Sequence, residues 1–152
     1  MLQVLINNIE NKFKIIALCE TRKINDNMVK MIANDNSFHY TKPKLNKCGG
    51  ILLIIDKNSD YKITNDYNIN IKTVDEIWME YNTEKNKKTL IAFIYRHPIN
   101  LHHEIDSFIK QLETSIKNAE NKKIYNTIII VGDVNINLLN NKNKEVEDYI
   151  NF

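Results

Sequence analysis

The sequence predicts one α/β domain with a strand-rich middle, and three observations support this fold class. The length of 152 residues suits a single domain, and an apolar content of 43% is enough to fill a buried core. Short apolar runs of strand length alternate with longer segments whose apolar residues recur at helical spacing. Neither an internal repeat nor a flexible linker divides the sequence. We therefore predict that residues 1–152 belong to one domain.

The N-terminal part combines two predicted helices with one strand. Apolar residues at helical spacing predict an amphipathic helix over residues 2–12. Residues 13–18 are almost wholly apolar, which is typical of a strand buried on both faces. A short helix is predicted over residues 25–34, with Asn25 as its N-terminal cap.

The middle of the chain consists of predicted strands separated by turns. Gly49 and Gly50 precede this region and Pro98 ends it. The predicted strands cover residues 51–55, 61–63, 71–74, 77–81 and 89–95.

The C-terminal part is predicted to be one long helix followed by a strand. Apolar residues from Leu101 to Ile116 form a single stripe, with Asn100 placed to cap the helix and Lys117 near its negative end. The apolar run at 127–131 predicts another buried strand, which Gly132-Asp133 ends.

Charge, hydropathy and cysteine usage narrow the functional classes. A net charge of +2 gives no global basic field of the kind that drives strong non-specific nucleic-acid binding. The apolar runs are far shorter than the about 20 residues that a membrane helix needs, so no membrane span is expected. The N-terminus also lacks the pattern of a signal peptide. Two cysteines, Cys19 and Cys48, make no disulfide framework, so we expect an intracellular protein of the nucleus or cytoplasm.

Three polar motifs each follow the end of an apolar predicted strand. They are Glu20, Tyr95-Arg96 and Asp133-Val134-Asn135. Groups just beyond the ends of buried strands are held rigidly and can converge in one cleft. A carboxylate in such a place is costly unless it reaches solvent, a partner or a cation. Glu20 and Asp133 would together suit Mg²⁺, which takes oxygen ligands and keeps waters for a phosphate substrate.

Each motif alone has a simpler interpretation. Gly132-Asp133 could be a plain turn, and Glu20-Thr21 could belong to a loop that enters a helix. Tyr95-Arg96 could be an edge tyrosine beside a surface arginine. The occurrence of all three in this order favours a shared site.

The ordered set of motifs resembles the endonuclease/exonuclease/phosphatase superfamily. The last two motifs look specifically like the endonuclease domain of non-LTR retrotransposons of the jockey type, and the resemblance covers nearly the whole chain. The runs that carry it are IIALCET at 15–21, GGI at 49–51, EIWME at 76–80, IYRHP at 94–98 and IIIVGDVNINLL at 128–139.

This resemblance implies an α/β (α+β) fold, a DNase I-like two-sheet β-sandwich flanked by helices, and a role for each motif residue. Glu20 would bind the metal, and Tyr95 would hydrogen-bond the scissile phosphate. Asp133 would orient or deprotonate the attacking water, and Asn135 would hold a phosphate oxygen. Arg96 is a further candidate phosphate contact, with a solvated surface charge as the alternative. The implied reaction is in-line attack of water on DNA with Mg²⁺, or Mn²⁺, stabilising the charge that develops.

The sequence departs from the family pattern at both ends. The family begins with a strand that carries an asparagine, and Asn7 and Asn8 do not replace it because they lie in the predicted helix. The family ends with a Ser-Asp-His segment that is not found here. None of the four histidines lies in that context, although His97 is the best placed to line the cleft if it is not simply on the surface. The four are His39, His97, His102 and His103.

We therefore expect the chain to be an incomplete domain, without the first strand and the C-terminal strands, and to have little nuclease activity alone. Two further substitutions, Val134 for an aromatic residue and Arg22 for a tryptophan, are compatible with the family. The intact parent, with a downstream reverse transcriptase, would cut DNA.

Other functions remain open from sequence. A phosphomonoesterase or an RNA deadenylase of the same superfamily is one alternative, and a non-catalytic remnant that binds nucleic acid or protein is another. Mg²⁺ affinity separates the enzyme from the remnant. If the site is real, the Glu20 and Asp133 carboxylates should lie at the same end of the sheet, close enough to share one hydrated cation. Tyr95 and Asn135 should face the same cleft.

Overall fold

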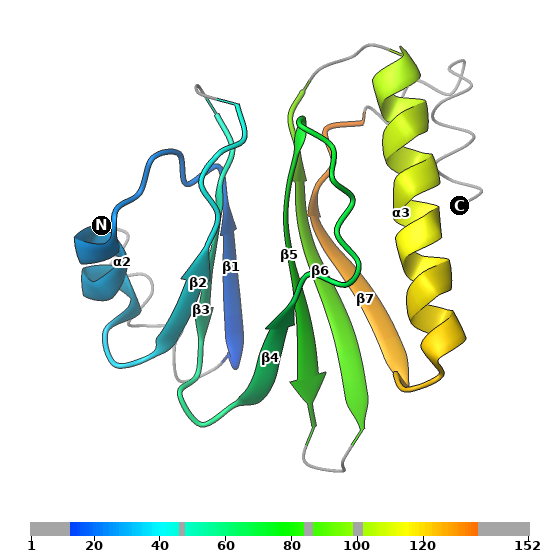
Figure 1. Ribbon diagram of the computed structural model, residues 1–152. Coiled ribbons are helices and arrows are strands. Elements are labelled where there is room, and N and C mark those ends of the chain that lie inside the picture. The colour runs from blue at the N-terminus through cyan, green and yellow to red at the C-terminus, as the bar shows by residue number, and fades with distance from the viewer. Residues whose placement is uncertain (1–12, 46–47, 84–86, 99–101, 137–152) are drawn as a thin grey trace.

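The computed structural model of the protein forms four layers, in the order helix, sheet, sheet, helix (Figure 1). It describes residues 13–45, 48–83, 87–98 and 102–136. One sheet has the strand order β1-β3-β2 and the other β4-β5-β6-β7. The elements are β1 (Ile15–Cys19), α2 (Asp26–Ala33), β2 (Ser37–Tyr40), β3 (Ile51–Ile55), β4 (Asp60–Thr64), β5 (Val74–Asn82), β6 (Lys88–Arg96), α3 (His102–Lys122) and β7 (Thr127–Asp133).

One hydrophobic core lies between the two sheets. In β3 the side chains of Ile51, Leu53 and Ile55 face the second sheet, because alternate residues of a strand point to the same side. They pack against residues of β5 and β6 that alternate in the same way, which are Ile77, Met79, Ile91, Phe93 and Tyr95.

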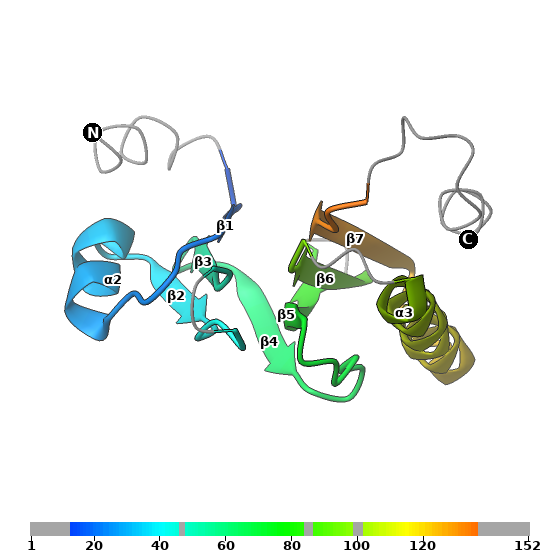
Figure 2. The same cartoon turned by 90° about the horizontal axis from the view of Figure 1, so that it is seen from above.

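Each sheet buries its outer face under one helix, as the view from above shows (Figure 2). Val29 and Ala33 of α2 are buried with Leu52 and Ile54 of β3. On the other side α3 covers the second sheet. There Phe108, Leu112 and Ala119 of the helix are buried with Leu90, Ala92 and Ile94 of β6. Both faces of β3 and β6 are therefore apolar, which explains their uninterrupted hydrophobic runs.

β6 and β7 are the one parallel pair among the described strands, and α3 connects them. Parallel strands end at the same edge of a sheet. Tyr95, near the end of β6, therefore lies opposite Asp133, the last residue of β7.

Most of the predicted elements are confirmed. The helix predicted over 25–34 is α2, and the Asn25 side chain caps it by accepting a hydrogen bond from the Met28 backbone N–H at 3.0 Å. The long helix reaches Lys122 rather than ending near Lys117, and its predicted cap Asn100 lies outside the described residues, as does the helix predicted over 2–12.

One expected strand is absent from the described residues, and one observed strand was not expected. Residues 71–74 do not form a strand, because the chain turns there: the Val74 N–H donates to the Ile71 carbonyl at 3.2 Å, and β5 starts only at Val74. β2 was not predicted, since its four residues are too short a run to show an alternating pattern.

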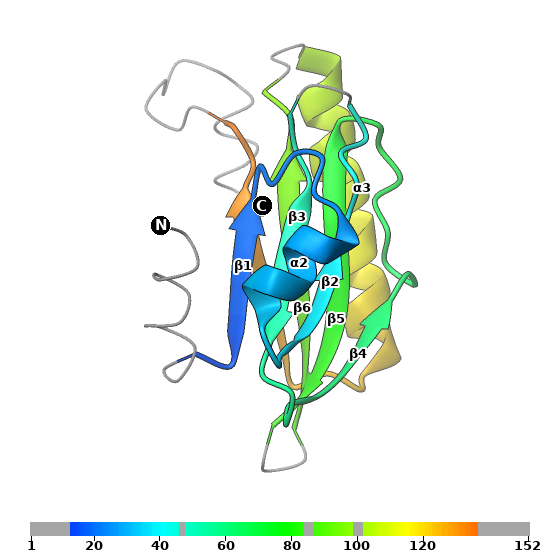
Figure 3. The same cartoon turned by 90° about the vertical axis from the view of Figure 1, so that its left-hand side faces the viewer.

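The expected burial of the first and last strands is also wrong. β1 is only half-buried, and in β7 Ile129, Ile130 and Val131 are 40%, 36% and 41% exposed. Both strands lie at the outer edge of their sheets, so one side of each has no hydrogen-bonded neighbour among the described strands (Figure 3). No helix in the described part of the chain is long and apolar enough to cross a membrane.

Candidate functional site

A hydrogen bond between the two sheets marks the candidate site. The Tyr95 hydroxyl, from β6, donates to Oε1 of Glu20, directly after β1, at 2.5 Å. The Tyr95 ring is fully buried between the sheets, whereas Glu20 is exposed. Burial, followed by the neighbouring Glu20 carboxylate, raises the pKa of Tyr95, so its hydroxyl stays protonated and acts as a donor.

Tyr95 therefore meets the expectation for a cleft residue only in part. Its ring belongs to the core between the sheets, packed with Phe93 and Ile51. Only the hydroxyl end reaches a polar group, the carboxylate of Glu20.

Asp133 lies at the same end of the sandwich as Glu20. The β6–β7 register pairs Asp133 with Tyr95, and Tyr95 contacts Glu20. Cys19, the last residue of β1, lies close enough to both carboxylates for their charges to affect the pKa of its thiol. Burial raises the pKa of its thiol, the backbone of Asp133 opposes this effect, and the charges of Asp133 and Glu20 add to it. Two exposed carboxylates, one after each edge strand, thus face the same region.

Asn135 joins the end of β7 to the end of β6. Its backbone N–H donates to Oδ1 of Asp133 at 2.9 Å, which closes a tight turn after the strand. Its side-chain Nδ2 donates to the Arg96 carbonyl at 2.7 Å. Asparagine suits this place because its backbone has a φ of 50°, a conformation that asparagine adopts more readily than most residues.

Arg96 is not the solvated surface charge that we considered, since its side chain is fully buried. Its Nε donates to the Val134 carbonyl at 2.7 Å and its Nη2 to the Asn135 carbonyl at 3.0 Å. Burial lowers the pKa of the guanidinium, and the charges of Glu104 and Asp133 oppose that shift. These contacts make Arg96 a clamp on the segment that carries Asp133 and Asn135.

A buried carboxylate that the sequence did not single out, Asp75, supports the loop that carries Glu20. Its Oδ2 accepts from the Gly50 N–H at 2.8 Å and its Oδ1 from the Lys44 N–H at 2.9 Å. The carbonyl oxygens of Gly50 and Gly49 then accept from the N–H groups of Thr21 and Arg22, at 3.3 and 2.8 Å. Asp75 in the second sheet is thereby connected through Gly49-Gly50 to the residues that follow Glu20.

This support matters because the loop is conformationally strained. Glu20 and Arg22 have φ values of 58° and 56°. Residues other than glycine in this region cost of order 1 kcal/mol and persist when the surroundings enforce them. Gly49 and Gly50 provide the enforcing contacts, with φ values of 100° and 84° that favour glycine.

Comparison with known proteins identifies the fold. No protein-family model and no curated protein sequence matches the chain. Among solved structures, the human nocturnin catalytic domain with bound sulfate matches with a TM-score of 0.61 and 17% identity over 97% of this chain. Zebrafish (D. rerio) TDP2, humanized by 14 mutations, matches with a TM-score of 0.60 and 12% identity over 97% of this chain. TDP2 from C. elegans matches with a TM-score of 0.58 and 10% identity over 90% of this chain.

These neighbours are members of the endonuclease/exonuclease/phosphatase superfamily. The chain has the fold of that superfamily. It spans 59%, 62% and 42% of the neighbours' own lengths, respectively. The predicted fold class, two sheets flanked by helices in a DNase I-like arrangement, is therefore confirmed.

Two side chains at this end of the sandwich could hold a hydrated cation. Glu20 and Asp133 are exposed carboxylates on the same side. The described residues contain no group of three or more acidic, histidine or cysteine side chains that could hold an ion by themselves. Mg²⁺ suits such an incomplete set, because it often binds one or two carboxylates and keeps waters and substrate phosphates as its other ligands.

His97 is a correction to the sequence analysis. We favoured a surface position for it, yet it is fully buried beside Tyr95, with 5.1 Å between the ring centroids. Its Nε2 lies 3.2 Å from Oδ2 of Asp75. His97 directly follows β6, but its partner Asp75 lies within β5, 22 residues earlier, so reasoning from strand ends could not pair the two.

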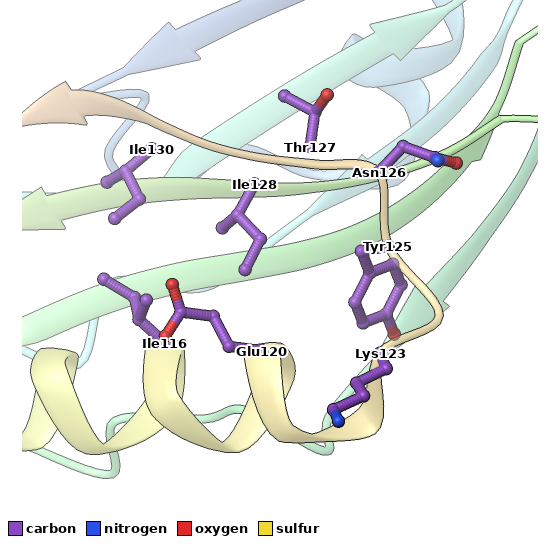
Figure 4. A pocket seen from close by; sticks show the side chains of 8 residues that line it. All are labelled: Ile116, Glu120, Lys123, Tyr125, Asn126, Thr127, Ile128 and Ile130. Carbon is purple, nitrogen blue, oxygen red and sulfur yellow. The ribbon is translucent and has the colours of Figure 1, made fainter.

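A pocket elsewhere on the superfamily fold is separate from these residues. It has a volume of about 670 Å³ and lies between the C-terminal half of α3 and the start of β7 (Figure 4). Ile116, Ile128 and Ile130 form its apolar part, while Glu120 and Lys123 form its polar part. It is at the opposite end of β7 from Asp133 and contains none of the strand-end motifs.

Proposed function

We propose that this chain carries part of the active site of a metal-dependent phosphodiesterase that cleaves DNA, of the kind found in jockey-type retrotransposons. The observation that carries the proposal is the contact between Tyr95 and Glu20 next to the end of β7. It brings together a neutral hydroxyl donor, an exposed carboxylate and a second exposed carboxylate, Asp133. In the proposed metal-dependent hydrolysis these groups would serve as a donor, a metal ligand and a base for water.

Each residue has a distinct role in the proposed reaction. Glu20 holds the cation, which supplies positive charge against the phosphate and the leaving oxygen. Tyr95, whose single hydroxyl hydrogen is donated to Glu20 in this structure, would have to turn that hydrogen to a phosphate oxygen to orient the phosphorus. Asp133, exposed to solvent, orients the attacking water and accepts its proton. Asn135 offers an amide with two N–H donors, one of which binds Arg96, and the amide is proposed to hold a phosphate oxygen.

Arg96 acts in this proposal mainly by holding the segment after β7. The two carbonyls that it binds belong to Val134 and Asn135. A direct contact of its guanidinium with phosphate would require it to give up part of that network. The structure therefore supports the positioning role better than the phosphate contact.

We also propose that the 152-residue chain has low activity by itself. Two of the described histidines are engaged elsewhere in the fold. His97 is buried against Asp75 and Cys48, and His39 contacts Tyr61 at 3.1 Å. Catalytic groups that act as a unit lose most of their rate when one is absent.

Metal binding tests the site without relying on activity. We expect Mn²⁺, as a paramagnetic substitute for Mg²⁺, to broaden the NMR signals of Cys19, Tyr95 and Asp133 selectively. Glu20→Gln should weaken this binding at least about tenfold, because it replaces a charged ligand with a neutral one. Glu113→Gln, on the exposed face of α3, is the matched control and should leave the affinity unchanged.

Equal Mn²⁺ affinity in the wild type and Glu20→Gln would remove Glu20 from the metal site. An absence of any binding would favour the alternative of a non-catalytic module that binds nucleic acid or protein.

DNA cleavage tests the reaction. Purified chain with Mg²⁺ should nick supercoiled plasmid at a rate close to that of the Glu20→Ala/Asp133→Ala double variant. Robust nicking that disappears in the double variant would establish the hydrolase and contradict the expected low activity. Phosphate release from a monoester in place of nicking would instead favour the phosphomonoesterase alternative.

A further inference from the structure

Cys48, His97 and Asp75 are joined by two successive side-chain contacts, and the His97 ring lies next to the Tyr95 ring. Sγ of Cys48 lies 3.3 Å from Nδ1 of His97, and Nε2 of the same ring lies 3.2 Å from Oδ2 of Asp75. The His97 and Asp75 side chains are 1% and 0% exposed, respectively. Cys48 is half-buried, so part of the residue is open to solvent.

The contacts determine which imidazole nitrogen carries the proton. An ionised carboxylate can only accept, and Asp75 already accepts from two backbone N–H groups, so Nε2 of His97 is the donor to Oδ2. In a neutral ring Nδ1 is then the acceptor, and it faces the Cys48 thiol. His97 is therefore oriented by Asp75 as a base for Cys48. A nucleophile, a base and a group that orients the base within hydrogen-bond reach are the signature of an activated nucleophile.

Gly49 fixes this arrangement in place. A Cβ atom there would lie 2.3 Å from Oδ2 of Asp75 and 2.5 Å from Cε1 of His97. The backbone next to Cys48 is thus packed directly against the other two members.

We propose that Cys48 is a nucleophilic modification site, activated by His97 and Asp75, for soft carbon electrophiles such as α,β-unsaturated carbonyl compounds. His97 takes the thiol proton at Nδ1 as the sulfur attacks the β-carbon. A carbon–sulfur bond forms, the carbon–carbon π electrons move onto the carbonyl, and the proton returns from Nδ1 to the α-carbon. The product is a neutral thioether, with no leaving group and no oxidant.

The experiment measures the reaction of the full chain with N-ethylmaleimide at pH 7, followed by mass spectrometry of the peptides that contain each cysteine. Cys19 is the internal comparison, since its charged neighbours are the carboxylates Glu20 and Asp133 rather than an imidazole. A free thiol is only a few per cent ionised at this pH, so full activation by His97 should speed Cys48 by about tenfold over the same cysteine in the denatured chain. Burial without activation by His97 would instead slow the reaction of Cys48 with N-ethylmaleimide.

His97→Gln and Asp75→Asn then test the cause. Both should return the Cys48 rate to the value of the denatured chain or below, while Cys19 stays slow. Cys19 thereby reports on folding, because an unfolded variant would expose it and raise its rate.

The comparison of native and denatured wild-type chain needs no variant, so it decides the proposal even if both variants unfold. A native Cys48 that reacts no faster than the denatured one would overturn the proposal. So would an undiminished Cys48 rate in a folded His97→Gln variant.

Discussion

Gly132→Ala is expected to destabilise the protein by about 3 kcal/mol or more, as overpacking and backbone strain both apply there. Gly132 lies within β7, with a φ of 146° that side chains rarely permit. An alanine Cβ would lie 1.8 Å from the carbonyl oxygen of Ile94 on β6. Backbone atoms cannot move aside cheaply, so the β6–β7 pairing must open at the end that carries Asp133. Urea denaturation followed by circular dichroism measures the loss.

Val131→Ala is the matched control, one residue earlier on the same strand. Val131 is 41% exposed, and the substitution should cost less than about 1 kcal/mol. A Gly132→Ala variant as stable as Val131→Ala would show that the two backbones are not as close as the structure places them.

The second large effect is expected at Asp75. Asp75→Ala should lower the free energy of unfolding by about 3 to 5 kcal/mol, the range for removing one partner of a buried charged network. The substitution leaves the N–H groups of Gly50 and Lys44 and Nε2 of His97 without their acceptor. Because Gly50 also holds Thr21, the loop that carries Glu20 should become more mobile. Denaturant unfolding and amide hydrogen exchange at Thr21 and Arg22 measure the two consequences.

Asp75→Asn separates shape from charge, since it keeps the size of the side chain and one acceptor oxygen. It should be less destabilising than Asp75→Ala. Asp35→Ala, at an exposed aspartate between α2 and β2, is the control and should have little effect. Equal stability of Asp75→Ala and Asp35→Ala would contradict the supporting role of this carboxylate.

The sequence was most informative about polar side chains that lie at the end of a strand. Glu20, Tyr95 and Asp133 each come at the end of an apolar run, and strand ends determine where a side chain emerges. The structure places these three at one end of the sandwich. Their metal and catalytic roles rest on the resemblance and stay predictions.

The sequence was least informative where partners come from distant segments. Asp75 and Gly50 are 25 residues apart, and Cys48 and His97 are 49 apart, so no local pattern links them. Edge positions were missed for a related reason. The apolar runs of β1 and β7 look the same as that of β3, and only the strand order shows which of them is covered on both sides.

The hydrogen bond between Tyr95 and Glu20 spans 75 residues and two sheets, which makes the site a product of tertiary assembly alone. Neither sheet carries all three residues, because one supplies the glutamate and the other supplies the tyrosine and the aspartate. Contacts of such sequence separation form only after the loop-closure entropy of the intervening chain has been overcome. Any ligand that needs both sheets therefore binds the docked sandwich selectively and, by mass action, resists its separation. A higher ligand concentration should therefore make the two sheets harder to separate.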